Sequence, residues 1–239
     1  MLLAIDTSTK HAGLLLWNSG VIASTWWYSK YNHTKHVIPE LEKLISENNF
    51  QVADIKAIAL AVGPGSFSAL RVGFSIAKGL CIALKIPLTG ISTLLAEAYS
   101  YRGTSQSICP LISLNQRTIA LGHFVIDKSN YITTIQPEIV VPTDKLPQFL
   151  PRGSMVCGEG TQNLKSMIDD VSIPEISIVE YCNPYRRLKS LAQLGNSKLE
   201  AGLADDPKTL QPRYLREPNI TKPNPAKLIK LGKSQKELM

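Results

Sequence analysis

The chain has 239 residues, of which 44% are hydrophobic and 19% charged, and its formal net charge is +7 with a pI near 9.2. This composition is ordinary for a globular protein, and the length suits one domain or two small lobes. Asp6 comes too early for a signal peptide, and Arg71, Lys78 and Lys85 interrupt the longest apolar stretch. We therefore expect a cytoplasmic protein without a membrane span. The four cysteines are far apart, which argues against a disulfide framework or a zinc site.

The first hundred residues alternate short β-branched runs with amphipathic stretches. Turn residues at 18–20 separate two of the runs and predict a hairpin. In chain order we expect strands at 2–5, 12–17 and 21–28, a helix at 34–47, a strand at 55–62, a helix at 66–84, a strand at 88–91 and a helix from 92 or 93. Three meandering strands followed by helix, strand, helix and strand are the order of a ribonuclease-H-like lobe.

The centre of this half is the buried strand at 55–62, a Gly-Pro-Gly-Ser turn and the helix at 66–84. The turn could cradle phosphate on helix N-terminal amides, although it lacks the spacing of a P-loop. The helix is apolar almost all round, which indicates burial on more than one side. Small residues four apart form a flat ridge on it, which packs either on the protein's own sheet or, as we favour, on a second chain: Ala69, Gly73 and Ala77.

The second half opens with another meander, at 108–114, 118–126 and 131–141, and this repeat predicts a second lobe. A short strand at 155–157 and helices near 163–168 and 188–203 would complete it. From residue 205 prolines and lysines predominate, as is typical of an extended, solvated tail. We divide the chain into an N-terminal lobe at 1–103, a smaller C-terminal lobe at 104–204 and a Pro-rich basic tail at 205–239.

Several segments resemble one known family. The segment GPGSFSALRVGFSIAKGL is similar to the central motif of the TsaB (YeaZ) family, a bacterial subunit of the machinery that makes threonylcarbamoyladenosine on tRNA. The opening MLLAIDTST, then GISTLLAEAY and PRYLR, extend the resemblance over nearly the full chain. It implies an α/β fold of two ribonuclease-H-like lobes of the actin/hexokinase/Hsp70-like (ASKHA) superfamily, with mixed sheets flanked by helices and a reduced second lobe.

The resemblance also implies partners. Such a protein is expected to pair with the TsaD transferase as a heterodimer through the helices at 34–47 and 66–84, and a TsaE ATPase would dock on that pair. The tRNA would be contacted indirectly, and a homodimer is the alternative for the lone chain. The partner-interface residues that we expect are His36, Leu41, Gly65, Ser66, Ala69, Leu70, Arg71, Gly73, Ala77 and Lys78.

Two turns are candidates for a nucleotide site. Asp6 ends the first strand, where superfamily phosphotransferases place an Asp in a phosphate hairpin. Its turn lacks the glycine that lets a backbone approach phosphate closely. Asp6 therefore either contacts nucleotide or caps its own turn through its side chain. The candidate nucleotide-binding residues are Asp6, Thr7, Gly158 and Gly160.

No residues predict metal binding or catalysis. His33 and His36 lie near a helix start without further ligands, and we interpret them as solvated. TsaD carries a metal-binding H-x-x-x-H, and the positions that match it here are Thr93 and Glu97, which do not make a catalytic metal site. We therefore expect no catalytic residue, no metal and no cofactor in the isolated subunit, with ATP used by the complex.

We interpret the chain as a non-catalytic scaffold subunit that binds TsaD and, with it, TsaE, to support threonylcarbamoyl transfer to adenosine 37 of tRNA. The alternative is a small actin-like ATP-dependent phosphotransferase that acts alone through Asp6 and the Gly158-Glu159-Gly160 turn. A nucleotide titration on the lone protein separates the two, because only the phosphotransferase needs a nucleotide site of its own.

Overall fold

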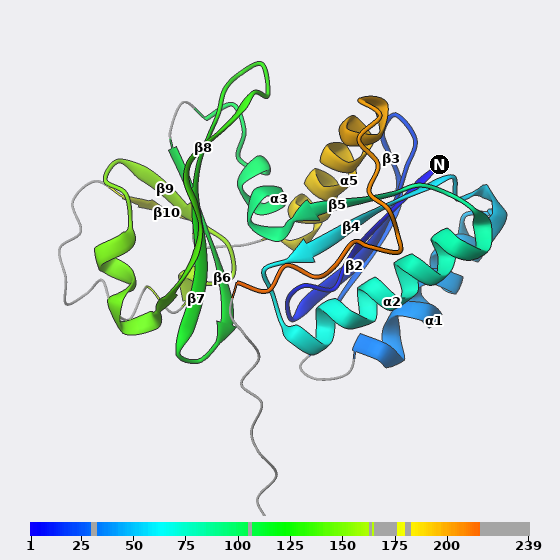
Figure 1. Cartoon of the computed structure of the whole chain (residues 1–239), viewed down its shortest axis with the longest axis horizontal. Coiled ribbons are helices and arrows are strands. Elements are labelled where there is room, and N and C mark those ends of the chain that lie inside the picture. Colours follow the sequence, from blue (N-terminus) through cyan, green and yellow to red (C-terminus); the bar gives the residue numbers. More distant parts are fainter. Residues whose placement is uncertain (30–32, 105–106, 163, 165–175, 180–182, 216–239) are drawn as a thin grey trace, which may run out of the picture.

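The computed structural model describes residues 1–29, 33–104, 107–162, 164, 176–179 and 183–215. Two five-stranded mixed sheets lie side by side, and helix α3 lies between them (Figure 1). This arrangement confirms the prediction of two mixed sheets flanked by helices.

The first sheet has the order β3-β2-β1-β4-β5. Its strands are β1 (Leu2–Asp6), β2 (His11–Trp17), β3 (Val21–Tyr28), β4 (Ala57–Gly63) and β5 (Leu88–Ser92). The first three strands are antiparallel, whereas β4 pairs in parallel with both β1 and β5. The central strands are buried and almost entirely apolar, as expected where helices cover both faces of a sheet.

Helices α1 (His33–Glu47) and α2 (Phe67–Leu84) cover one face of this sheet, and α5 (Pro184–Glu200) covers the other (Figure 1). The apolar stripe of α1, with Val37, Leu41 and Leu44, joins Leu3 and Ile5 of β1 in one core. Lys85 ends α2 in the left-handed conformation, with φ 55°.

The position of α5 corrects one expectation. We placed a helix near 188–203 in the second lobe, but α5 packs on β1, β2 and β4 of the first sheet. It also begins earlier than predicted, because the Asn183 side chain accepts a hydrogen bond from the Tyr185 amide and Pro184 suits the first helical position. Gly195 allows a close approach to the sheet, since a Cβ there would clash with that of Ala59.

The second sheet has the order β10-β9-β6-β7-β8, which is the strand order of the first sheet repeated. Its strands are β6 (Ser107–Asn115), β7 (Thr118–Ile126), β8 (Ile132–Pro142), β9 (Ser154–Cys157) and β10 (Ser177–Ile178). Helix α3 (Thr93–Tyr99) covers one face, and the 3-10 segment η2 (Thr143–Phe149) lies on the other. Strand β10 and η2 were not predicted, and the helix predicted near 163–168 lies largely outside the described residues.

The first part of the predicted tail packs on the body of the protein. The Asp205 amide donates to the Leu88 carbonyl, and the Arg213 amide donates to the Val62 carbonyl at 2.7 Å. Leu210 packs against the core beneath α1 and α2. Residues 205–215 are therefore not a solvated tail, and the remainder of it lies outside the described residues.

Candidate functional site

The turn after β1 is held by the side chain of Asp6, which is buried. Its Oδ1 accepts hydrogen bonds from the Ser8 amide at 2.9 Å and from the Ser8 hydroxyl at 2.6 Å. Thr7 donates from its hydroxyl to the Ala69 carbonyl at 2.8 Å. Asp6 therefore caps its own turn, which is one of the two alternatives that its position leaves open.

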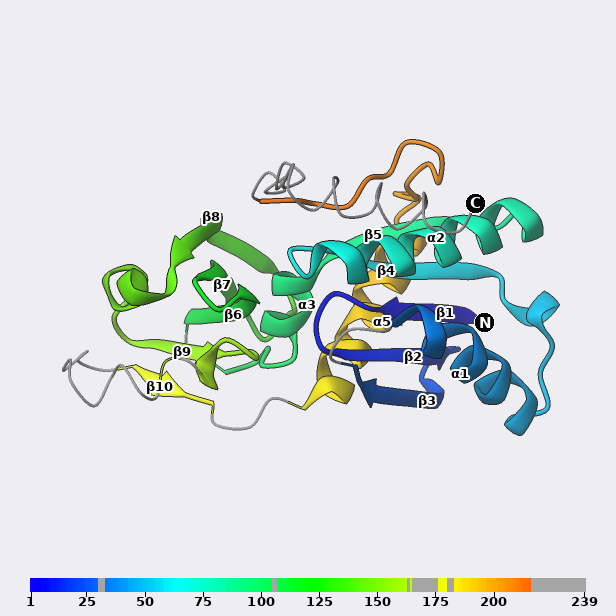
Figure 2. The ribbon, with the colours of Figure 1, turned by 90° about the horizontal axis from the view of Figure 1, so that it is seen from below.

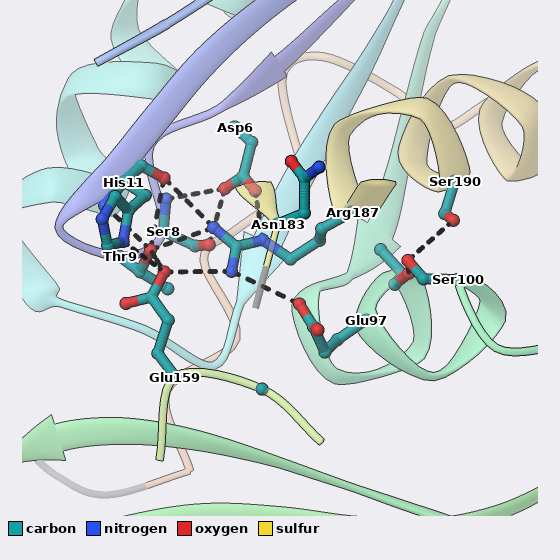
Figure 3. A network of polar contacts seen from close by, with 12 residues as sticks. Asp6, Ser8, Thr9, His11, Glu97, Ser100, Glu159, Asn183, Arg187 and Ser190 are labelled. Atoms are coloured by element: carbon teal, nitrogen blue, oxygen red, sulfur yellow. Dashed lines mark hydrogen bonds and ion pairs between the residues drawn. The ribbon is translucent and has the colours of Figure 1, made fainter. Parts of the chain in front are cut away.

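A buried arginine from α5 meets this turn (Figure 3). Arg187 donates from Nε to Asp6 Oδ2 at 2.7 Å, and from Nη1 to Glu159 at 3.2 Å and Glu97 at 3.5 Å. Its Nη2 donates to the Thr9 hydroxyl at 2.9 Å and to the His11 carbonyl at 3.1 Å. These contacts use all five N–H donors of the guanidinium, so the group is fully hydrogen-bonded.

We call these six residues the Arg187 network: Asp6, Thr9, His11, Glu97, Glu159 and Arg187. The network joins the two lobes, because Asp6 lies on β1 of the first sheet and Glu159 follows β9 of the second (Figure 3). The sequence analysis grouped Asp6 with the turn around Glu159 as candidates for a nucleotide site. In the structure both contact Arg187, which the sequence did not reveal. One signal was available: Arg187 shares a helical stripe with Leu191 and Leu194, at i+4 and i+7, and such a position is normally buried.

The charges of the network depend on one another. Burial alone would lower the pKa of Arg187, but the carboxylates of Asp6, Glu159 and Glu97 raise it. Burial alone would raise the pKa of Glu159. Hydrogen bonds from His11 and Thr9 and the charge of Arg187 outweigh this effect and lower that pKa to about 2. For Glu97 burial predominates over Arg187 and the pKa is raised. Arg187 and Glu159 are thus charged at neutral pH, and Glu97 is the carboxyl whose ionisation burial opposes.

The glycines on either side of Glu159 serve packing. Gly158 has a φ of +93°, which favours glycine, and a Cβ there would clash with the Leu111 carbonyl oxygen. The Gly160 amide donates to the same carbonyl at 3.0 Å. The turn is thereby fixed onto β6. A nucleotide role for Asp6, Thr7, Gly158 and Gly160 stays a prediction.

Thr93 and Glu97, the positions at which the resemblance leads us to expect the metal-binding histidines of TsaD, are both buried in α3. Glu97 contacts Arg187, as described above. Within the described ranges, no group of three or more His, Cys, Asp and Glu side chains is arranged to hold a metal ion. His36 is exposed as expected, but His33 is buried, which corrects its interpretation as solvated, and that burial lowers its pKa.

The ridge that we assigned to a partner faces the core of the first lobe. Ala69, Gly73 and Ala77 are buried, and a Cβ on Gly73 would clash with the Thr7 hydroxyl and lie 3.4 Å from Leu60 Cδ1. Two other expected interface residues, Leu41 and Leu70, are also buried in the core of the first lobe. The small residues let α2 approach β4 and the turn after β1. The expectation that these five residues lie at a partner interface was therefore wrong.

The opposite side of α2 is exposed. It carries one aromatic residue, one cation and otherwise small or aliphatic residues: Phe67, Ser68, Arg71, Ser75, Gly79, Ile82 and Ala83. We call this set the α2 outer face. Of the other expected interface residues, Gly65, Ser66 and Lys78 are half-buried, and His36 is exposed on the neighbouring α1. Among the described helices, α2 alone has the length and composition to cross a membrane, a test that core helices of soluble proteins also pass.

The fold and the network define a class: a two-lobed α/β protein with the actin-like arrangement of two ribonuclease-H-like sheets, joined at the seam by a buried arginine. The structure of YeaZ from Pseudomonas aeruginosa has this fold, with a TM-score of 0.74, 23% identity and coverage of 90% of this chain and 99% of that chain.

Sequence comparison gives the family. The TsaD family model, described as tRNA N6-adenosine threonylcarbamoyltransferase, matches residues 28–223. The tRNA threonylcarbamoyladenosine biosynthesis protein TsaB of Bacillus subtilis is 30% identical over 218 residues, 90% of this chain and 93% of that protein. TsaB of Escherichia coli is 35% identical over 97 residues, which span 41% of this chain and 42% of that protein. The chain belongs to the TsaB (YeaZ) family, and the predicted resemblance is confirmed.

Proposed function

We propose that the chain is a non-catalytic subunit in the formation of threonylcarbamoyladenosine on tRNA. In this proposal it pairs with a TsaD-type transferase, a TsaE-type ATPase docks on the pair, and the assembly works in the cytoplasm. ATP is used by the complex, and the subunit holds no cofactor or metal of its own. The names of the curated relatives supply the reaction.

The observation that carries the pairing is the α2 outer face. Helix α2 is strongly apolar, but only a third of its residues are buried within the protein's own fold. Ser75, Gly79 and Ala83 follow one another four apart along the exposed side, so they would let a second helix approach closely. Without TsaD, the same face would pair two copies of this chain.

The absence of catalysis is supported by the Arg187 network. Oδ1 of Asp6 accepts from Ser8 and Oδ2 accepts from Arg187, so both carboxylate oxygens have protein partners. A phosphotransferase that acts alone would have to free this carboxylate from Arg187 before it could serve a nucleotide. The alternative function is therefore disfavoured, and the nucleotide titration on the lone protein remains its direct test.

Two glycines of one helix test the pairing. Gly79→Leu adds a large side chain where a Cβ would meet nothing within 4 Å, and it gains up to about 1 kcal/mol of helix propensity. The variant should keep the melting temperature of the parent but fail to co-elute with TsaD in size-exclusion chromatography. Gly73→Leu is the matched change on the buried side, and overpacking should cost it about 1–3 kcal/mol of stability. A folded Gly79→Leu protein that still co-elutes with TsaD would contradict the proposed interface.

A further inference from the structure

The face of the first lobe opposite α1 and α2 carries three cations that form no ion pair with any acidic side chain that the structure describes. Arg186 and Lys189 are exposed on α5, and Arg102 follows α3. None of the three takes part in an ion pair with any described residue. The acidic side chains of the Arg187 network are engaged with Arg187, and two of them, Asp6 and Glu97, are buried.

Two of these cations contact tyrosine rings and backbone carbonyls at the end of α3. The Arg186 guanidinium lies 4.9 Å from the centre of the Tyr101 ring and donates to the Ser100 carbonyl at 3.3 Å. Arg102 lies 4.5 Å from the Tyr99 ring and donates to the Tyr99 carbonyl at 3.2 Å. The two carbonyls belong to consecutive residues, so the guanidinium groups are anchored at one place. An arginine has five N–H donors, so each keeps donors for an anion.

Two exposed aromatic residues lie on the side of the first sheet that α5 covers. Trp26 and Tyr28 are 48% and 57% exposed, and as alternate residues of β3 they point to the same side of the sheet. A Cβ on Gly13 would lie 2.9 Å from Leu188 Cδ2 and 3.2 Å from Trp26 Cβ. Trp26 therefore lies near Leu188 of α5, the residue that precedes Lys189. Strand β3 is the outer strand of the first sheet (Figure 2).

We propose that this surface, the α5 face, binds a single-stranded segment of RNA directly. The α5 face consists of Trp26, Tyr28, Arg102, Arg186 and Lys189. The three cations would neutralise phosphates, and the two exposed rings would stack with bases. An acidic protein segment would satisfy the cations but not the flat rings. The inference deepens the proposed function, on which it rests, because it gives the subunit its own contact with the RNA substrate.

The geometry permits both partners at once. Helices α1 and α2 form one core with the first sheet, and α5 forms a separate core on its other side. A transferase on the α2 outer face would therefore leave the α5 face open to RNA. The net charge of +7 favours the same partner, since it attracts a polyanion to the protein as a whole.

The test uses the full chain alone and a fluorescently labelled, unstructured 12-nucleotide oligouridine, with binding followed by anisotropy at increasing NaCl. Arg186→Glu with Lys189→Glu should weaken binding at least tenfold and reduce the slope of log Kd against log salt by about 1.4, or about 0.7 per lost phosphate contact. Trp26→Ala with Tyr28→Ala should weaken binding by about tenfold and leave the salt slope unchanged, because stacking releases no counterions.

Matched variants control for charge and for ring loss. Lys43→Glu with Lys56→Glu makes the same change in net charge on other exposed parts of the first lobe. Tyr131→Ala removes a ring that is 71% exposed on the second lobe. Both should bind the oligonucleotide as the parent does. A parent that does not bind, control variants that lose as much as the α5-face variants, or equal binding of an oligoglutamate peptide would overturn the inference.

Failure of this inference is distinguishable from failure of the proposed function. The α5-face variants should keep the parent melting temperature and still co-elute with TsaD, and Gly79→Leu should still bind oligouridine. If the α5-face variants bind RNA normally while the parent pairs with TsaD, only the RNA inference is wrong. If the parent fails to pair with TsaD, the proposed function is wrong whatever the oligonucleotide does.

Discussion

The two lobes share one strand order but differ in how their sheets are covered. Helix α3 follows β5 of the first sheet yet packs on β6 and β7 of the second. Helix α5 follows β10 of the second sheet yet packs on β1, β2 and β4 of the first. Each lobe thus gives its last helix to the other. The first sheet gains a second covered face by this exchange, and neither lobe is complete without the other.

The exchanged helices meet at the seam between the lobes. Ser100 and Ser190 share a hydrogen bond at 3.1 Å, and Glu97 of α3 faces Arg187 of α5 (Figure 3). The polar network therefore lies at the crossing point of two helices that each belong to both lobes. The comparison teaches that the seam is part of the folding core and differs from an open cleft between independent domains.

The largest effect on stability is expected when Arg187, the buried cation between the two lobes, is removed. Arg187→Met leaves the buried carboxyls of Asp6 and Glu97 and the half-buried carboxyl of Glu159 without their common partner. Removing one member of a buried ion pair typically costs about 3–5 kcal/mol, and we expect a loss of that size in urea unfolding. The neighbouring Arg186→Met is the matched control and should change stability by less than about 0.5 kcal/mol, because Arg186 is exposed. Equal stability of the two variants would show that the network does not hold the lobes together.

The pattern of apolar residues and turns predicted every strand of the two sheets except β10, because strand period and hairpin signals are local. Contacts between elements were not predictable in the same way. The ridge at Ala69, Gly73 and Ala77 fitted a partner or the protein's own sheet equally well, and only the fold showed that Thr7 and Leu60 lie beneath Gly73. Arg187 was missed because its partners lie far away in the sequence. Strand β10 has two residues, too few for a periodic signal.

A smaller, pH-dependent effect is expected at Glu159. Its pKa falls from 4.5 to about 2 on folding, so its ionised form adds stability that is present above pH 4.5 and lost as the pH falls toward 2. Glu159→Gln should be less stable than the parent at pH 7 by about 1.5–3 kcal/mol, the usual value of hydrogen bonds to a charged group. The difference should shrink through this pH range in urea unfolding. Burial raises the pKa of Glu97, and the charge of Glu159 adds to that rise, so parent and variant are compared in a Glu97→Gln background in which this carboxyl does not titrate. A difference that is constant with pH would refute the ionised network.

The smallest effect on stability is expected from a change in the packing of α5 on the first sheet. Gly195→Val places side-chain atoms against Ala59 and Thr89, and overpacking should cost about 1–3 kcal/mol. Gly79→Val, at an open helical position, serves as the control and should leave stability unchanged or slightly raised. If thermal unfolding does not separate the two variants, the close approach of α5 to β4 is not a requirement of the fold.

The exchange of helices has a consequence for synthesis on the ribosome. All strands of the first sheet have been made once Ser92 has emerged, but one apolar face of that sheet waits for α5, which begins at Pro184. At about 5–20 residues per second, the nascent chain would expose that face for roughly 5–20 seconds while the second lobe is translated. A nascent-chain chaperone is therefore expected to engage the first lobe during this interval and to leave once α5 has docked.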